Sequence, residues 1–215
     1  MPAPVAILHV DESCLGNGRS GATPGGAGGL IEVRTRGGIQ RRDFYLADAD
    51  TTNNRMALEG AAEALRLLAG KGARLRALIV SDSEYLVRGM REWMPRWAAR
   101  NWKKQGGPIE NLELWQALAE AATRHDVQWT WVRGHRGHPK NEYADELAVG
   151  AAVRQESSNG AVASGFGPWL AGRRERGLFA GYDPDASFSE LERRIAVGER
   201  VPLSLSENRH AGRSQ

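Results

Sequence analysis

Short apolar runs and longer helical runs alternate along the first 150 residues, and this alternation limits the possible folds more than any other feature of the chain. Apolar runs this short, bounded by polar or turn-forming residues, are typical of buried strands. They predict strands at residues 5–10, 30–33, 44–46, 78–80 and 127–132. The longer runs predict helices at residues 56–68, 85–90, 111–123 and 139–153. This order indicates an α/β fold, with a five-stranded mixed sheet flanked by helices.

Glycine-rich and polar segments divide the chain further. Residues 16–29 are rich in glycine and predict a turn-rich connection between the first two strands. Residues 155–167 are rich in Ser, Gly, Asn and Ala, as linkers are. Beyond them, residues 187–190 fit a capping box that opens a helix through Ile195. We therefore predict one domain at 1–153 and, at 154–215, a linker and a C-terminal extension of unknown role.

Composition excludes several classes of protein. The chain has 29 Lys+Arg and 26 Asp+Glu, and its 41% hydrophobic content is ordinary for a soluble globular protein. No run approaches the length of a membrane-spanning helix, and the first ten residues lack the basic start of a signal peptide. Cys14 is the single cysteine, which excludes an intrachain disulfide and a cysteine-based zinc site. We expect a cytoplasmic monomer that does not bind membranes.

Three aspartates occupy similar places in the predicted elements. Asp11 ends the first strand, Asp82 follows the fourth strand, and Asp145 lies in the first half of the last helix. Such positions can converge at one edge of a sheet, where carboxylates repel each other unless a cation neutralises them. Oxygen ligands suit Mg²⁺ or Mn²⁺. Taken singly, each aspartate could instead be an N-cap, a turn residue or a surface residue.

Five motifs follow one another along the first 150 residues. The motifs are VDESCLGN (10–17), TTNNRM (51–56), VSDSEYLVRGM (80–90), NLELWQAL (111–118) and WVRGHRGHPKNEYADELA (131–148). Together they resemble ribonuclease HI, the type 1 ribonuclease H family, and occur in that family's order and spacing. The resemblance covers residues 5–150 but not 155–215. The predicted order of strands and helices is also that of the ribonuclease H fold.

The resemblance implies an endonuclease that hydrolyses the RNA strand of RNA–DNA hybrids and leaves 5′-phosphate and 3′-hydroxyl ends. It implies two Mg²⁺ ions, with Mn²⁺ as a substitute, one ion activating water and the other stabilising the leaving 3′ oxygen. Asp11 would be the bridging ligand, with Asp82 and Asp145 as further ligands. His135 would move protons or help product release. We interpret His138 as structural.

One family ligand is missing. The family has a metal-binding Glu directly after NNRM, where this chain has Ala57. Glu59 is two residues further along the predicted helix, about 200° away around its axis, and would need a register shift to reach the metals. The family usually has Gly after its first Asp, and here the residue is Glu12. Our hypothesis is that Glu12 supplies the fourth carboxylate; the alternatives are that Glu12 points to solvent or that Ala57 is an engineered change.

Substrate contacts are also implied by the resemblance. Residues 91–104 combine basic side chains with three tryptophans and match the family's basic protrusion, which grips the DNA strand. The alternative is that the tryptophans pack the helix onto the core, Trp93 first. The minor-groove contacts would include Asn53 and Asn54, either of which could instead cap the helix. The predicted substrate-binding set is Cys14, Asn17, Asn53, Asn54, Trp97, Arg100, Trp102, Lys103 and Lys104.

Two functions are therefore open. The first is an active, metal-dependent ribonuclease H. The second is a hybrid-binding protein whose catalysis is weakened or lost through Ala57.

Overall fold

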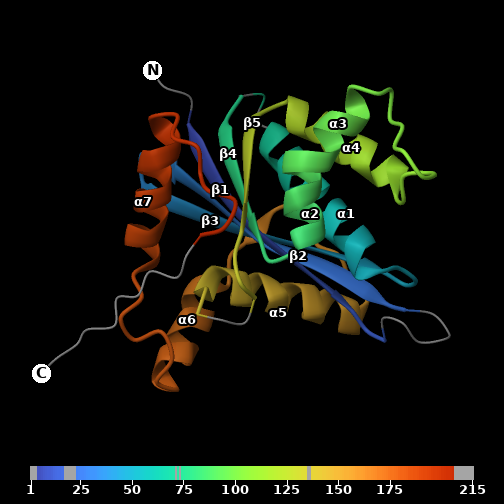
Figure 1. The fold of residues 1–215 in the computed structure, drawn as a ribbon. Helices are drawn as coiled ribbons and strands as arrows, with labels where there is room; N and C mark the ends of the chain where they lie inside the picture. The colour runs from blue at the N-terminus through green and yellow to red at the C-terminus, as the bar shows by residue number, and fades with distance from the viewer. Residues whose placement is uncertain (1–3, 17–22, 71, 73, 135–136, 206–215) are drawn as a thin grey trace, which may run out of the picture.

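The computed structural model describes residues 4–16, 23–70, 72, 74–134 and 137–205, and its centre is one mixed sheet (Figure 1). The strands lie in the order β5-β4-β1-β2-β3-β6. β1, β2 and β3 form an antiparallel meander, and β4 and β5 run parallel to β1. Their bounds are β1 (Val5–Cys14), β2 (Gly25–Thr35), β3 (Gly38–Asp48), β4 (Arg76–Ser81), β5 (Asp126–Trp131) and β6 (Val162–Ala163). The predicted sheet had five strands; β6 of the extension is the sixth.

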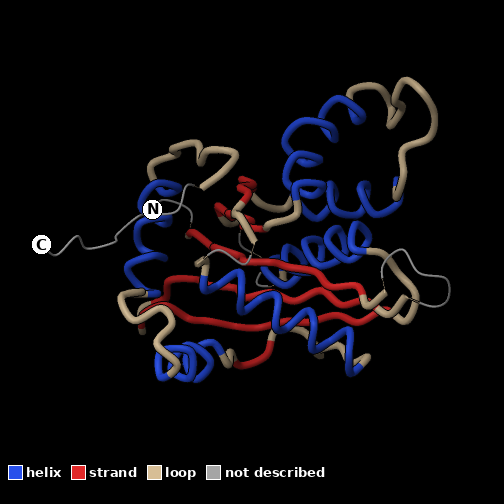
Figure 2. The backbone as a smooth tube through the Cα atoms, turned by 60° about the horizontal axis from the view of Figure 1, so that its bottom comes forward, coloured by secondary structure: helices blue, strands red, loops and turns tan. Residues whose placement is uncertain are grey.

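Helices cover both faces of the sheet (Figure 2). On one face lie α1 (Asn53–Ala69), α2 (Glu84–Arg88), α3 (Met94–Ala98) and α4 (Leu112–Thr123), with a π-helical turn at Gly89–Trp93 joining α2 to α3. The other face carries α5 (Pro139–Arg154) and α7 (Pro184–Ala196), and α6 (Phe166–Glu175) packs beside α5. No helix among the described residues is both long and apolar enough to cross a membrane.

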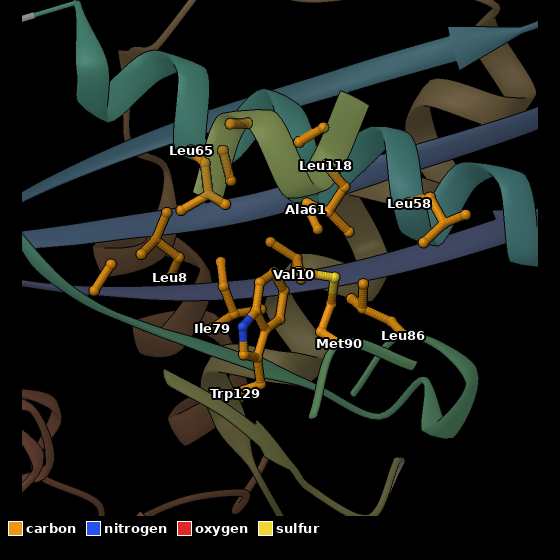
Figure 3. Close-up of a cluster of buried hydrophobic side chains, with 14 of the residues drawn as sticks. Leu8, Val10, Leu58, Ala61, Leu65, Ile79, Leu86, Met90, Leu118 and Trp129 are labelled. Carbon is orange, nitrogen blue, oxygen red and sulfur yellow. The ribbon is translucent and has the colours of Figure 1, made fainter. Parts of the chain in front are cut away.

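The main core lies between the sheet and α1. Because side chains alternate along a strand, Leu8 and Val10 of β1 face this core, whereas Ile7 faces the opposite side with α7. Figure 3 shows side chains of β1 and β4 beside Leu58 and Leu65 of α1. The same alternation sends the side chains of Asp11 and Glu12 to opposite faces of β1.

The glycines of residues 25–29 belong to β2, so the prediction of a turn-rich connection was wrong for this part of the chain. Gly26 and Gly28 lie directly beneath α5. A Cβ atom on Gly28 would come within 2.5 Å of the backbone nitrogen of Ala148. The strand is therefore glycine-rich because the backbone of α5 lies against it, a known use of glycine in strands.

The C-terminal extension packs against the sheet. Within the predicted linker, Ser158 accepts a hydrogen bond from the backbone of Tyr45, and β6 pairs with β3. Helix α7 begins at Pro184 with Asp183 as its N-cap, three residues before the predicted capping box. Phe188 and Ile195 of α7 are buried against the strand residues that α5 leaves uncovered. The extension therefore completes the second face of the sheet.

Candidate active site

The parallel pairing of β1 with β4 brings two of the predicted carboxylates together. His9 is the partner of Val80, and Asp11 and Asp82 each lie two residues further along. β4 ends at Ser81, whereas β1 continues to Cys14. The prediction that Asp11 ends its strand was therefore wrong, because Asp11 lies inside β1. The strand that ends next to the carboxylates is β4. Carboxylate oxygens of Asp11, Glu12 and Asp82 all lie within 4.8 Å of one another.

Asp11 and Glu12 start from opposite faces of β1. Asp11 faces α5, where its Oδ2 accepts a hydrogen bond of 2.9 Å from the Nδ2 of Asn141. Glu12 alternates with it and so shares the face of Val10, which packs on α1. The backbone N–H of Glu12 donates to Oδ1 of Asp11 at 2.8 Å. The Glu12 side chain thus leaves the strand on the face that is covered by the helix carrying Ala57.

The carboxylates perturb one another strongly. Burial and the neighbouring Asp82 raise the pKa of Asp11 to about 10. The same two causes raise the pKa of Glu12 to about 8. Asp145 adds repulsion at both groups, so the helix residue also lies close enough to interact with the pair. Burial and neighbouring negative charge thus disfavour ionisation of Asp11 and Glu12, and a cation bound between the carboxylates would favour it.

The donor set fits a hard divalent cation. All the converging atoms are carboxylate oxygens, which Mg²⁺ and Mn²⁺ prefer. The buried Oδ1 of Asn141 adds another oxygen, for which the described residues supply no hydrogen-bond donor. The site can therefore hold divalent metal through oxygen ligands alone.

Three neighbours of the carboxylates were not predicted as site residues. Asn141 anchors Asp11, as described above. The indole Nε1 of Trp131 donates to the backbone oxygen of Asp82 at 2.8 Å. Gly134 lies so close to Asp82 that a Cβ atom there would collide with its Oδ2. All three belong to the last of the five motifs, but their residue types alone do not reveal these contacts.

Helix α1 adds no carboxylate to this group. Ala57 is buried in the main core. Glu59 pairs with Arg55 at 3.7 Å, and Glu63 pairs with Arg66 at the same distance. Neither belongs to the acidic group found among the described residues. The register shift that would bring Glu59 to the site does not occur in the structure.

The predicted minor-groove residues lie around the start of α1. Thr52 is the N-cap and accepts from the backbone N–H of Arg55, so neither Asn53 nor Asn54 has the capping role considered above. Both are partly buried in the first helical turn. The Sγ of Cys14 lies 3.4 Å from the backbone oxygen of Thr51 and ties β1 to this turn. Asn17 and His135 lie outside the described residues.

The basic segment divides into packing and exposed residues. Trp93, Trp97 and Trp102 are all partly buried and pack on the main core. The ring of Trp97 meets that of Trp115 edge-on, with centroids 5.6 Å apart. The predicted packing of Trp93 is confirmed, and the other two tryptophans share it. The basic side chains Arg100, Lys103 and Lys104 are exposed.

This strand order, with carboxylates converging where β4 ends, defines a ribonuclease H-like α/β protein with a site for divalent cations. Residues 4–153 match the RNase H family, and the chain belongs to this family, as its motifs predicted. It is thus an enzyme of the hydrolase class, a type 1 ribonuclease H.

Named relatives agree with this placement. A ribonuclease H of Methylococcus capsulatus is 42% identical over 146 residues, which cover 67% of this chain and 87% of that protein. Ribonuclease HI of Pseudomonas aeruginosa is 43% identical over 144 residues, covering 66% and 89%. The crystal structure of LC9-RNase H1 is 50% identical with a TM-score of 0.74, covering 80% of this chain and 82% of that one. That protein is described as a type 1 RNase H with the type 2 active-site motif.

Proposed function

We propose that this protein is an endonuclease that hydrolyses the RNA strand of RNA–DNA hybrids. One observation carries the proposal: the carboxylates of Asp11, Glu12 and Asp82 converge within 4.8 Å in a chain of the ribonuclease H family. The products would carry 5′-phosphate and 3′-hydroxyl ends. A cytoplasmic location and a monomeric state stay predictions.

The proposed cofactor is a pair of Mg²⁺ ions, with Mn²⁺ as a substitute. Asp11, Glu12, Asp82 and Asp145 would hold them. When bound, the ions supply a more acidic attacking water and neutralise the charge that develops on the leaving 3′ oxygen. Charge neutralisation would also offset the burial and the repulsion from Asp82 that raise the pKa values of Asp11 and Glu12.

Glu12 is the proposed replacement for the carboxylate that Ala57 lacks. Its side chain starts on the face of β1 that α1 covers, so the relocated carboxylate comes from the strand beneath the helix. LC9-RNase H1, which is 50% identical to this chain, is described as a type 1 RNase H with the type 2 active-site motif, and this supports a changed ligand set in a type 1 enzyme. Asn141 would hold Asp11 in place through the hydrogen bond to Oδ2.

The remaining roles follow the family resemblance. His135 would transfer protons or help product release. Asn53 and Asn54, with Cys14 and Asn17 nearby, would contact the minor groove, where the 2′-hydroxyl distinguishes RNA from DNA. The exposed Arg100, Lys103 and Lys104 would bind DNA phosphates. Trp97 and Trp102 would use only the parts of their rings that packing leaves exposed.

The second candidate function is that of an RNA–DNA hybrid-binding protein whose catalysis is weakened or lost. The observation that favours it is Ala57, which stands where the family has a metal-binding Glu. A cleavage assay on an end-labelled RNA–DNA hybrid in Mg²⁺ distinguishes the active endonuclease from the hybrid-binding protein. The main proposal expects cleavage by the wild type and none by Asp145→Asn. Tight hybrid binding without cleavage in either Mg²⁺ or Mn²⁺ would contradict it and favour the hybrid-binding protein.

A further inference from the structure

A chain of charges, buried at Glu32 and Lys140 and exposed at Asp185, links the C-terminal extension to the start of α5. Glu32 of β2 is fully buried, and its carboxylate contacts Lys140 of α5 at 2.7 Å and Arg41 of β3 at 2.9 Å. Arg41 in turn reaches Asp185 of α7 at 2.5 Å. The charges alternate in sign along the whole chain, so each buried group has an opposite partner.

Lys140 is held by the extension directly as well. Its Nζ donates to the backbone oxygen of Pro184 at 3.0 Å. The Lys140 side chain is only 2% exposed, so its ammonium depends on Glu32 and the backbone oxygen of Pro184 for the interactions that water would otherwise supply. The first turn of α5 is therefore fastened to α7 by a contact that is costly to break.

The fastened turn is the one that touches the metal site. Asn141, next to Lys140, donates to Asp11, and Asp145 lies one turn further along the same helix. A shift of the α5 start would move both residues relative to β1.

The extension also reaches the site from its other side. The backbone of Leu203 and Leu205 forms hydrogen bonds with the N–H and the carbonyl of Trp131, at 2.7 and 3.0 Å. The same Trp131 uses its indole N–H to hold the backbone of Asp82. The extension thus contacts Trp131, which donates to Asp82, and Lys140, whose neighbour in the chain, Asn141, donates to Asp11.

We propose that the C-terminal extension is a positioning element of the metal site and that Lys140 is the positioning residue through which it acts. Lys140 would touch neither metal nor substrate. It sets where Asn141 and Asp145 lie when the cation binds. The proposal rests on the proposed function for its catalytic consequence, but not for its consequence on metal binding.

Two substitutions test it, with one matched control. Lys140→Met removes the ammonium while keeping the length of the side chain. Asp185→Asn breaks only the outer link to Arg41. Glu192→Gln is the control. Glu192 also lies on α7 and pairs with Arg34 at 2.7 Å, but this pair is not part of the chain of charges that leads to Lys140. Mn²⁺ binding by calorimetry, hybrid cleavage and thermal unfolding are measured for each.

Removing a group that holds a metal ligand in place typically lowers metal affinity or activity by about 10–100-fold. We expect Lys140→Met to weaken Mn²⁺ binding by about ten-fold and to slow cleavage similarly, and Asp185→Asn to weaken binding by about two- to five-fold. Glu192→Gln should match the wild type in both. If Lys140→Met does not fold, the comparison of Asp185→Asn with Glu192→Gln decides.

A purely structural role predicts something different. Variants that unfold at lower temperature but bind Mn²⁺ with wild-type affinity, measured well below their unfolding temperature, would overturn the proposal. A wild type that binds Mn²⁺ without cleaving hybrid would instead refute the proposed function, and the Mn²⁺ affinities would still test the role of Lys140.

Discussion

At the scale of single residues, the site depends on two adjacent acids that leave β1 in opposite directions. Asp11 is held by Asn141 of α5, and Glu12 lies on the face covered by α1. The motif predicted both as site residues, but the strand pattern ended β1 before Glu12 and so did not predict their opposite directions. The contacts with Asn141, Trp131 and Gly134 could not, because they join segments distant in sequence through side chains of ordinary type.

Protons compete with metal at this site. The folded protein without metal holds the pKa of Asp11 at about 10 and that of Glu12 at about 8, both above their unfolded values. The folded state therefore binds more protons than the unfolded state from acid pH up to these values, and its stability falls as pH rises through this window. Because metal needs the ionised carboxylates, we expect Mg²⁺ affinity to rise from about pH 6 to about pH 8.

Calorimetry in buffers of different ionisation enthalpy measures this directly, since metal binding should release protons. Equal Mg²⁺ affinity across the range, with no proton release, would show that the carboxylates are already ionised in the free protein.

Gly134 is predicted to be essential for the position of Asp82. Gly134→Ala places a Cβ atom against Oδ2 of Asp82, so the carboxylate or the loop must move. We expect hybrid cleavage to fall by about ten-fold or more, as for other changes that displace a metal ligand. Gly172→Ala is the matched control, because no described atom lies near the added methyl group. Equal activity of the two variants would remove Gly134 from the site.

At the scale of elements, the sequence predicted the order of the first five strands and of helices α1, α2, α4 and α5, but neither α3 nor the extent of β2. Turn propensity favours a loop at residues 25–29, and burial under α5 overrides it. The predicted linker also contacts the sheet. Its small polar residues serve as hydrogen-bonding partners for β3, and a pattern of apolar residues cannot reveal them.

The contact of β2 with α5 gives a prediction about stability. Gly28→Ala adds a methyl group where the backbone of α5 lies 2.5 Å away. Overpacking of this kind costs about 1–3 kcal/mol, and more where backbone must move. Urea unfolding should show that loss for Gly28→Ala and almost none for Gly37→Ala, whose methyl group meets nothing closer than 3.9 Å. An unchanged midpoint for Gly28→Ala would mean that the two elements separate easily.

At the scale of the whole molecule, the division at residue 153 does not coincide with a boundary in the core. Phe188, Ile195 and Val201 are buried with Val5 and Ile7 of β1. A core shared in this way could not be predicted from the family resemblance, which ends before the extension.

Removing the extension should therefore destabilise the protein. A chain ending at Arg154 uncovers the strand residues beneath α7 and loses several buried side chains, each worth about 1.5–3 kcal/mol. The sum is of the order of the whole stability of a domain. We expect a large drop in the unfolding temperature or an insoluble product. A truncated chain that unfolds at the same temperature as the full chain would show that the extension is dispensable.

The central claim is that Glu12 supplies the carboxylate that α1 lacks. The most direct measurement is the rate of hybrid cleavage in Mg²⁺ by the wild type, Glu12→Ala and the double variant Glu12→Ala, Ala57→Glu, with Glu84→Gln as a control for a nearby exposed acid. We predict cleavage by the wild type and the control, loss by a factor of about 100 or more in Glu12→Ala, and partial recovery in the double variant. If Glu12→Ala cleaves the hybrid as fast as the wild type does, the claim is contradicted.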